Sequence, residues 1–153
     1  MSIAPVKCSV DVKAPLARAF ELFAGNMGAW WPRGMTPGGS PHAELVIEPR
    51  TNGRWFERDA AHNETQWGRV LAWEPPRRLL LGWQLGPDFR YNADLLMEVE
   101  ILFEERAGGG TRVSLEHRDL QQLGADAEIF AGKVRTGWPA RLQNFAEYAV
   151  IHP

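Results

Sequence analysis

The sequence lacks the residues that several classes of protein depend on. Its one cysteine, Cys8, can form neither an intramolecular disulfide nor a zinc site built on paired thiolates. Lys and Arg number 17 against 19 Asp and Glu, and this balance argues against a nucleic-acid partner, which requires a basic face. No apolar run approaches the length of a membrane span, and the N-terminus shows no secretory signal. We therefore expect a cytoplasmic, reduced protein without membrane contact.

Motifs for several kinds of chemistry are also missing. The sequence has no phosphate-binding G-x-x-x-x-G-K and no G-x-S-x-G turn around a nucleophilic serine. Its histidines lie far apart, without the spacing of a metal site: His42, His62, His117 and His152. Cys8 lies on the apolar side of an expected strand and is a poor candidate for a nucleophile. We expect no metal and no cofactor.

Tryptophan, in contrast, is abundant. The 153 residues include seven tryptophans but two tyrosines, and indoles bring a large apolar area with one N–H group that needs a partner when buried. The length predicts a single domain over residues 1–153. Seven indoles in one such domain indicate a wide interior, which the indoles either fill or line as the wall of a cavity.

Alternating and helical patterns divide the chain into three parts. Residues 6–12 alternate as a half-buried strand, and a short helix follows with Pro15 at its first position. Gly25 and Gly28 end this helix before a loop that contains Trp30 and Trp31. Six more strands joined by short turns are expected at 43–48, 54–58, 65–73, 79–85, 96–105 and 111–117.

The C-terminal third predicts a long helix. Asp126 is a suitable N-cap. One apolar stripe follows at steps of three and four residues: Val134, Trp138, Leu142, Phe145 and Ala149. Gly137 and Pro139 interrupt the pattern and predict either a kink or two abutting helices. The resulting fold class is α+β, with a curved antiparallel sheet around the C-terminal helix and a ligand-sized gap between them.

This order of elements resembles the helix-grip fold of the START-like or SRPBCC superfamily, which includes the birch-pollen-allergen-like proteins. Within it, the sequence is most similar to the small bacterial relatives of the activator of heat-shock protein 90 ATPase. The resemblance rests on Trp30-Trp31-Pro32 and on the segments 48–57, 67–79, 110–117 and 137–142. Two segments depart from the family pattern. Thr51-Asn52-Gly53 replaces a double-glycine turn, and 89–96 fits poorly, which predicts an individual pocket rim.

The resemblance implies a cavity but no single reaction. Members of the superfamily bind lipids, hormones or polyketides, and some catalyse cyclisation or dehydration. Our first hypothesis is therefore a domain that binds a hydrophobic or aromatic small molecule without catalysis. The alternatives are a co-chaperone-like partner of heat-shock protein 90, with a role in stress response, and an enzyme. Either a monomer or a homodimer is compatible with the sequence.

Parity along the strands identifies the candidate site residues. His117 shares a face with Val113 and Leu115, and Glu57 shares one with Trp55, so both polar groups are expected to point inward. They are the candidates for an acid and a base, and His117 is also a candidate hydrogen-bond partner for Glu57. The expected ligand-binding residues are Trp31, Trp55, Glu57, Trp83, Phe103, His117 and Trp138.

The remaining tryptophans are expected to lie elsewhere. Trp67 and Trp73 alternate with the small side chains of their strand and are predicted to face outward or to lie at the sheet's edge. Trp31, next to Pro32, is predicted to turn into the cavity. Trp30 is predicted to pack on the first helix or to cover the cavity's opening.

Overall fold

Seven strands form one antiparallel sheet, in the order β1-β7-β6-β5-β4-β3-β2. The computed structural model describes residues 3–152. The strands are β1 (Val6–Val12), β2 (His42–Ile47), β3 (Arg54–Asp59), β4 (Glu64–Glu74), β5 (Arg78–Trp83), β6 (Met97–Glu105) and β7 (Thr111–Arg118). Every predicted strand is present, and the chain has the expected helix-grip architecture.

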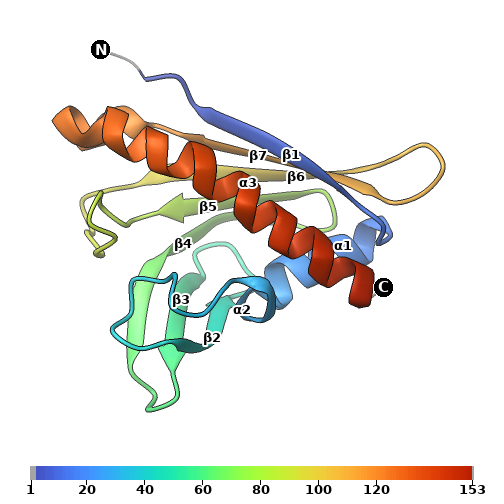
Figure 1. Cartoon of the computed structure of the whole chain (residues 1–153), viewed down its shortest axis with the longest axis horizontal. Coiled ribbons are helices and arrows are strands. Elements are labelled where there is room, and N and C mark those ends of the chain that lie inside the picture. Colours follow the sequence, from blue (N-terminus) through green and yellow to red (C-terminus); the bar gives the residue numbers. More distant parts are fainter. Residues whose placement is uncertain (1–2, 153) are drawn as a thin grey trace.

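Four helical segments complete the fold: α1 (Leu16–Gly25), α2 (Met27–Trp30), the 3-10 segment η1 (Leu120–Asp126) and α3 (Ala127–Ile151). Helix α3 crosses one face of the curled sheet diagonally and ends near α1 (Figure 1). The predicted stripe on α3 is buried along its whole length, from Val134 to Ala149. The core therefore lies between α3, α1 and the inner face of the sheet.

Three local predictions about the helices need correction. Pro15 precedes α1 as its N-cap residue instead of starting the helix, and Gly28 lies inside α2. Trp30 thus ends a short helix and is not part of a loop. Pro139 lies inside α3, which is one continuous helix, so the alternative of two abutting helices is wrong. Asp126 occupies the N-cap position of α3, but its side chain makes no capping hydrogen bond.

Strand β4 carries two irregularities that change which side chains face the core. Trp55 pairs with Gly68 and Phe56 with Gln66, so Trp67 is an extra residue opposite β3. Val70 pairs with Leu81 and Ala72 with Leu80, which makes Leu71 an extra residue opposite β5. An extra residue in one strand shifts the alternation of all residues beyond it.

These bulges overturn the predicted outward placement of Trp67 and Trp73. Trp67 is 1% exposed and packs among core aromatic rings. Trp73 is half-buried and packs edge-on against Phe20 of α1, with ring centroids 5.1 Å apart. Simple alternation fails here because each bulge inserts one residue between an inward and an outward position.

Gly68 allows β4 and β5 to approach each other closely. A Cβ atom at Gly68 would collide with the carbonyl oxygen of Gly82 on β5. Gly68→Ala is therefore expected to lower the free energy of unfolding by about 2 kcal/mol, as overpacking does in a filled core.

Gly132→Ala is the control, because a Cβ atom there would meet nothing within 4 Å. Since it replaces glycine inside a helix, it should stabilise the protein by about 0.5 to 1 kcal/mol. Urea denaturation of both variants checks this, and a tolerated Gly68→Ala would contradict the packing described.

Candidate functional site

Adjacent tryptophans diverge at the end of α2. Trp30 keeps a helical backbone, whereas Trp31 turns to an extended one (φ −79°, ψ 127°), as expected for a residue before proline. Trp30 packs against Phe23 of α1 and donates its indole N–H to the carbonyl oxygen of Leu22, 3.1 Å away. Trp31 donates its own to the carbonyl oxygen of Met35 at 2.9 Å. Trp30 therefore packs on the first helix, as predicted, while Trp31 points toward a pocket.

The pocket lies between α3, the segment that follows α2 and the loop between β5 and β6. Its volume is about 340 Å³, at the lower end of the range of roughly 300 to 1,000 Å³ that is typical of small-molecule sites. It is lined by Trp31, Met35, Trp83, Phe89, Lys133, Val134, Thr136, Gly137, Trp138 and Arg141. Three of the predicted ligand-binding tryptophans, at positions 31, 83 and 138, thus line one cavity.

Aromatic rings form most of the pocket wall. The Trp138 ring lies edge-on to Trp31 and to Trp83, with centroid distances of 5.8 and 5.7 Å. Phe89 approaches Trp83 at 6.4 Å from the β5–β6 loop, and 37% of its surface is exposed. A flat apolar molecule in this pocket would therefore be in contact with aromatic rings on several sides. Phe89 also confirms that segment 89–96 contributes to the rim.

Behind this wall lies a second layer of indoles. Trp67 packs edge-on against Trp31 at 5.1 Å, and Trp55 lies between Trp67 and Trp83 at 5.2 and 5.7 Å. Trp55 is fully buried and its indole nitrogen has no hydrogen-bond partner among the described residues. The second layer supports the wall from within the core and does not reach the cavity.

Glu57 is buried beneath the segment that follows Trp31. It is 1% exposed, which agrees with the predicted inward direction. Its carboxylate accepts hydrogen bonds from the Trp67 indole (2.9 Å), the Thr36 hydroxyl (2.8 Å) and the Gly38 backbone N–H (3.0 Å). A Cβ atom at Gly38 would lie 2.5 Å from the Glu57 Oε2 atom. Through these hydrogen bonds, Glu57 anchors to the sheet the segment that contains Met35.

His117 lies on β7, fully buried among aromatic rings. Its Nδ1 atom accepts a hydrogen bond from the Trp138 indole at 3.0 Å, so in the neutral ring the proton is on Nε2. That Nε2 atom has no partner among the described residues. Burial lowers the pKa of His117 from its ordinary 6.5 to about 3. The imidazole is therefore neutral at physiological pH and positions Trp138 in the pocket wall.

The two polar candidates do not meet. Glu57 is on β3 and His117 on β7, with three strands between them in the sheet order, and no hydrogen bond joins them. His117 is thus not the partner of Glu57. Phe103, another predicted ligand-binding residue, packs against Phe20 and Phe23 and does not line the pocket.

Several pocket residues were not predicted. Met35 and Phe89 come from irregular loops, which have no period to reveal where a side chain points. Lys133 and Arg141 lie next to the predicted stripe of α3, eight residues apart with Gly137 midway between them. Because this spacing puts both residues on one face of the helix, the sequence did contain a signal from which Lys133 and Arg141 could have been predicted to lie in the pocket.

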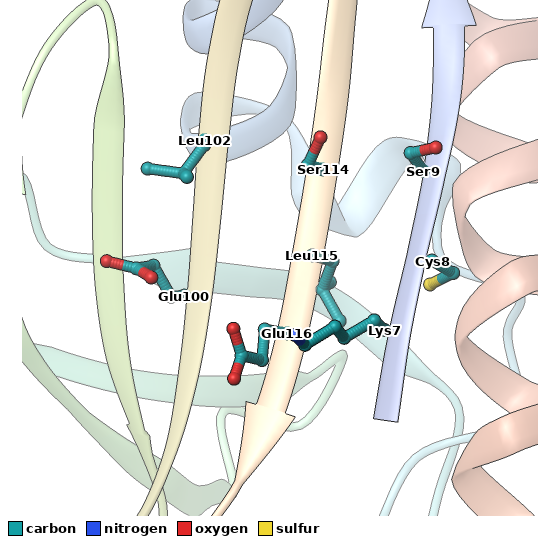
Figure 2. A pocket seen from close by; sticks show the side chains of 8 residues that line it. All are labelled: Lys7, Cys8, Ser9, Glu100, Leu102, Ser114, Leu115 and Glu116. Atoms are coloured by element: carbon teal, nitrogen blue, oxygen red, sulfur yellow. The ribbon is translucent and has the colours of Figure 1, made fainter. Parts of the chain in front are cut away.

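A second hollow lies where β1, β7 and β6 run side by side (Figure 2). Its volume is about 430 Å³, and charged side chains such as Lys7, Glu100 and Glu116 contribute to its lining. Glu100 already forms ion pairs with Arg78 and Arg118 at 2.7 and 3.1 Å. Glu116 also lies 3.9 Å from Arg118, so both carboxylates of this hollow are paired within the protein. No aromatic side chain of the described residues lines it, and the aromatic pocket is therefore the better candidate for a ligand site.

Comparisons with known proteins agree with the fold. The family model described as activator of Hsp90 ATPase homolog 1-like protein matches residues 13–149. A search of functionally curated proteins gives no significant match. Within residues 3–152, no helix combines the length and apolar character needed to cross a membrane.

Two solved structures are similar in sequence as well as in fold. The anthrahydroquino-gamma-pyrone synthase Txn09 is 33% identical, with 95% of this chain and 97% of that chain covered and a TM-score of 0.66. CalC from Micromonospora echinospora, described as a self-sacrificing resistance protein, is 30% identical, with 95% and 93% covered and a TM-score of 0.70. An Aha1 dimer from Colwellia psychrerythraea shares the fold at 10% identity, with 95% of each chain covered and a TM-score of 0.66.

Proposed function

We propose that this chain, which belongs to the activator of Hsp90 ATPase homolog 1-like family, binds a flat aromatic small molecule in the pocket under α3. The observation that carries the proposal is the lining of that pocket. Trp31, Trp83, Phe89 and Trp138 surround it from four separate elements of the chain. Rings of this size bury large apolar areas and stack favourably on other aromatic systems.

The similar structures support a polycyclic ligand. Txn09 is named as a synthase of an anthrahydroquino-gamma-pyrone, and its chain matches this one over nearly its full length. A fused three-ring quinone is flat and largely apolar, which suits a pocket with aromatic walls. We therefore use a neutral hydroxymethylanthraquinone as the test ligand.

The surroundings of Glu57 and His117 support a binding function over acid–base catalysis by these two residues. The Glu57 oxygens are engaged by three donors, and neither residue lines the cavity. An enzyme of this family would need other groups for proton transfer. The alternative of interaction with Hsp90 rests on the family description and predicts that the protein stimulates the chaperone's ATPase. Stimulation that survives Phe89→Ala would favour that alternative.

The binding proposal is tested by calorimetric titration of hydroxymethylanthraquinone. Phe89→Ala is expected to weaken binding about tenfold, because it removes one aromatic ring from the pocket wall. The substitution should leave the fold intact, since Phe89 adds little to the core. Tyr91→Ala is the matched control, since Tyr91 is an exposed aromatic residue of the same loop that does not line the pocket. No binding to the wild-type protein, or equal weakening by both substitutions, would overturn the proposal.

A further inference from the structure

We propose that the ligand of this pocket carries an acidic group, a carboxylate or an equivalent oxyanion, which Arg141 binds while the aromatic wall holds its rings and Lys133 adds positive charge from the other end of the pocket. This inference rests on the proposed function and narrows its ligand class to flat aromatic acids. It assigns Arg141 as the residue that sets specificity.

The polar lining of the pocket is cationic. Among the ten lining residues, Lys133 and Arg141 are basic, none is acidic, and Thr136 is the one hydroxyl. Both cations project from α3, eight residues and therefore about 12 Å apart along its axis. Gly137 lies between them and carries no side chain that would block the space. A ligand lying along α3 can thus contact the wall and reach a cation at either end.

Arg141 has no counter-ion among the residues that the structure describes. Its Nε atom donates to Asn144 Oδ1 at 2.9 Å, and its Nη1 atom lies 3.2 Å from the sulfur of Met35. Over residues 3–152, no carboxylate oxygen lies within 4.0 Å of the Arg141 guanidinium. An amide and a thioether are weak partners for a guanidinium, which remains charged in proteins.

Arg141 is also half-buried, so water compensates its charge incompletely. Burial lowers the pKa of the Arg141 guanidinium below its ordinary value. Sheet arginines of similar exposure, such as Arg58 and Arg118, are each paired with two or more carboxylates. Arg141 therefore differs from them in having donors that are available to a ligand.

Lys133 completes the cationic lining from the other end. Its Nζ atom contacts the carbonyl oxygen of Pro87 at 3.3 Å and, in the described part of the chain, forms no ion pair. Asp88, the acidic residue next to Phe89, lies 4.0 Å from Arg90 and does not line the pocket. The acidic residue nearest in sequence to the rim therefore does not neutralise the pocket.

The geometry suits an acid attached to a ring. The Arg141 guanidinium carbon lies 5.9 Å from the centroid of the Trp31 ring, beside the aromatic wall. A planar molecule against that wall can direct an edge substituent toward the Arg141 N–H groups. Charge-assisted hydrogen bonds from arginine to a carboxylate are about twice as strong as neutral ones and are frequently bidentate.

The test compares two probes that differ in one substituent. Anthraquinone-carboxylate is expected to bind the wild-type protein at least tenfold more tightly than hydroxymethylanthraquinone, and added salt should reduce this preference. Arg141→Gln should abolish most of the preference, because it weakens binding of the carboxylate probe much more than binding of the neutral probe. Arg141→Lys should retain part of it, and Lys133→Gln should reduce it. Arg135→Gln is the control, because Arg135 is exposed on α3 and does not line the pocket.

The outcomes separate the two proposals. If both probes bind the wild-type protein equally well, the acidic-group inference is wrong and the aromatic pocket stands. A preference that survives Arg141→Gln would also overturn the inference, since another group would then be responsible. If neither probe binds, both proposals fail.

Discussion

Glu57→Ala is expected to lower the free energy of unfolding by about 3 kcal/mol. The substitution leaves the buried Trp67 indole N–H without an acceptor and releases Thr36 and Gly38. An orphaned buried donor alone costs about 1 to 3 kcal/mol. Because Thr36 and Gly38 lie one and three residues after Met35 in the chain, the same substitution should also weaken binding of the anthraquinone probes.

Two further variants distinguish the loss of the hydrogen bonds to Glu57 from the general effect of removing a negative charge. Glu57→Gln keeps an oxygen for Trp67 and Gly38 and an amide group beside Thr36, so we expect a loss of about 1 kcal/mol. Glu64→Ala removes an exposed carboxylate that pairs with Arg54 and Arg58, and its effect should be smaller than that of Glu57→Ala. Urea denaturation measures all three. An unfolding free energy of Glu57→Ala equal to that of Glu64→Ala would contradict the anchoring role.

The buried His117 should make the folded state sensitive to acid. Its pKa is about 3 in the folded protein and 6.5 ordinarily, so on acidification the unfolded chain takes up the proton first. The contribution of His117 to stability is complete above pH 6.5 and is lost as the pH falls toward 3. Between pH 7 and pH 4 this loss amounts to about 3 kcal/mol.

His117→Gln isolates this contribution from the carboxylates that titrate in the same range. Glutamine offers an acceptor to the Trp138 indole but does not titrate, so the variant should lose about 3 kcal/mol less than the wild type between pH 7 and pH 4. Urea denaturation at several pH values measures the slopes. Parallel slopes for His117→Gln and the wild type would show that His117 does not stay neutral in the folded protein.

The sequence was sufficient for the parts of the fold that repeat regularly. The strands and the α3 stripe follow the alternation and the helical period directly, and the inward direction of Glu57 and His117 follows from parity within one strand. Trp67 was misplaced because its bulge arises from pairing between β3 and β4, which no single strand reveals. Parity also shows which face a residue lies on but not how far apart two residues lie, so Glu57 and His117 remained candidate partners.

The pocket was only partly predictable for a related reason. Trp138 lies on a periodic helix, and Trp31 turns away from Trp30 because of Pro32, so both could be anticipated. Phe89 has a positive φ of 61° within an irregular loop, and its contact with Trp83 depends on the path of that loop. The role of Arg141 depends on the absence of a carboxylate near its guanidinium within residues 3–152, and such an absence is a property of the assembled structure.

The seven indole N–H groups offer the most direct test of the central claim, that a flat aromatic molecule binds under α3. Each tryptophan gives its own signal in a ¹H–¹⁵N correlation spectrum, and titration with hydroxymethylanthraquinone reports on all of them at once. We predict large shifts for Trp31, Trp83 and Trp138, a smaller one for Trp67 behind the wall, and almost none for Trp30 and Trp73. An unchanged spectrum, or shifts centred on Trp73 beside α1, would contradict the account.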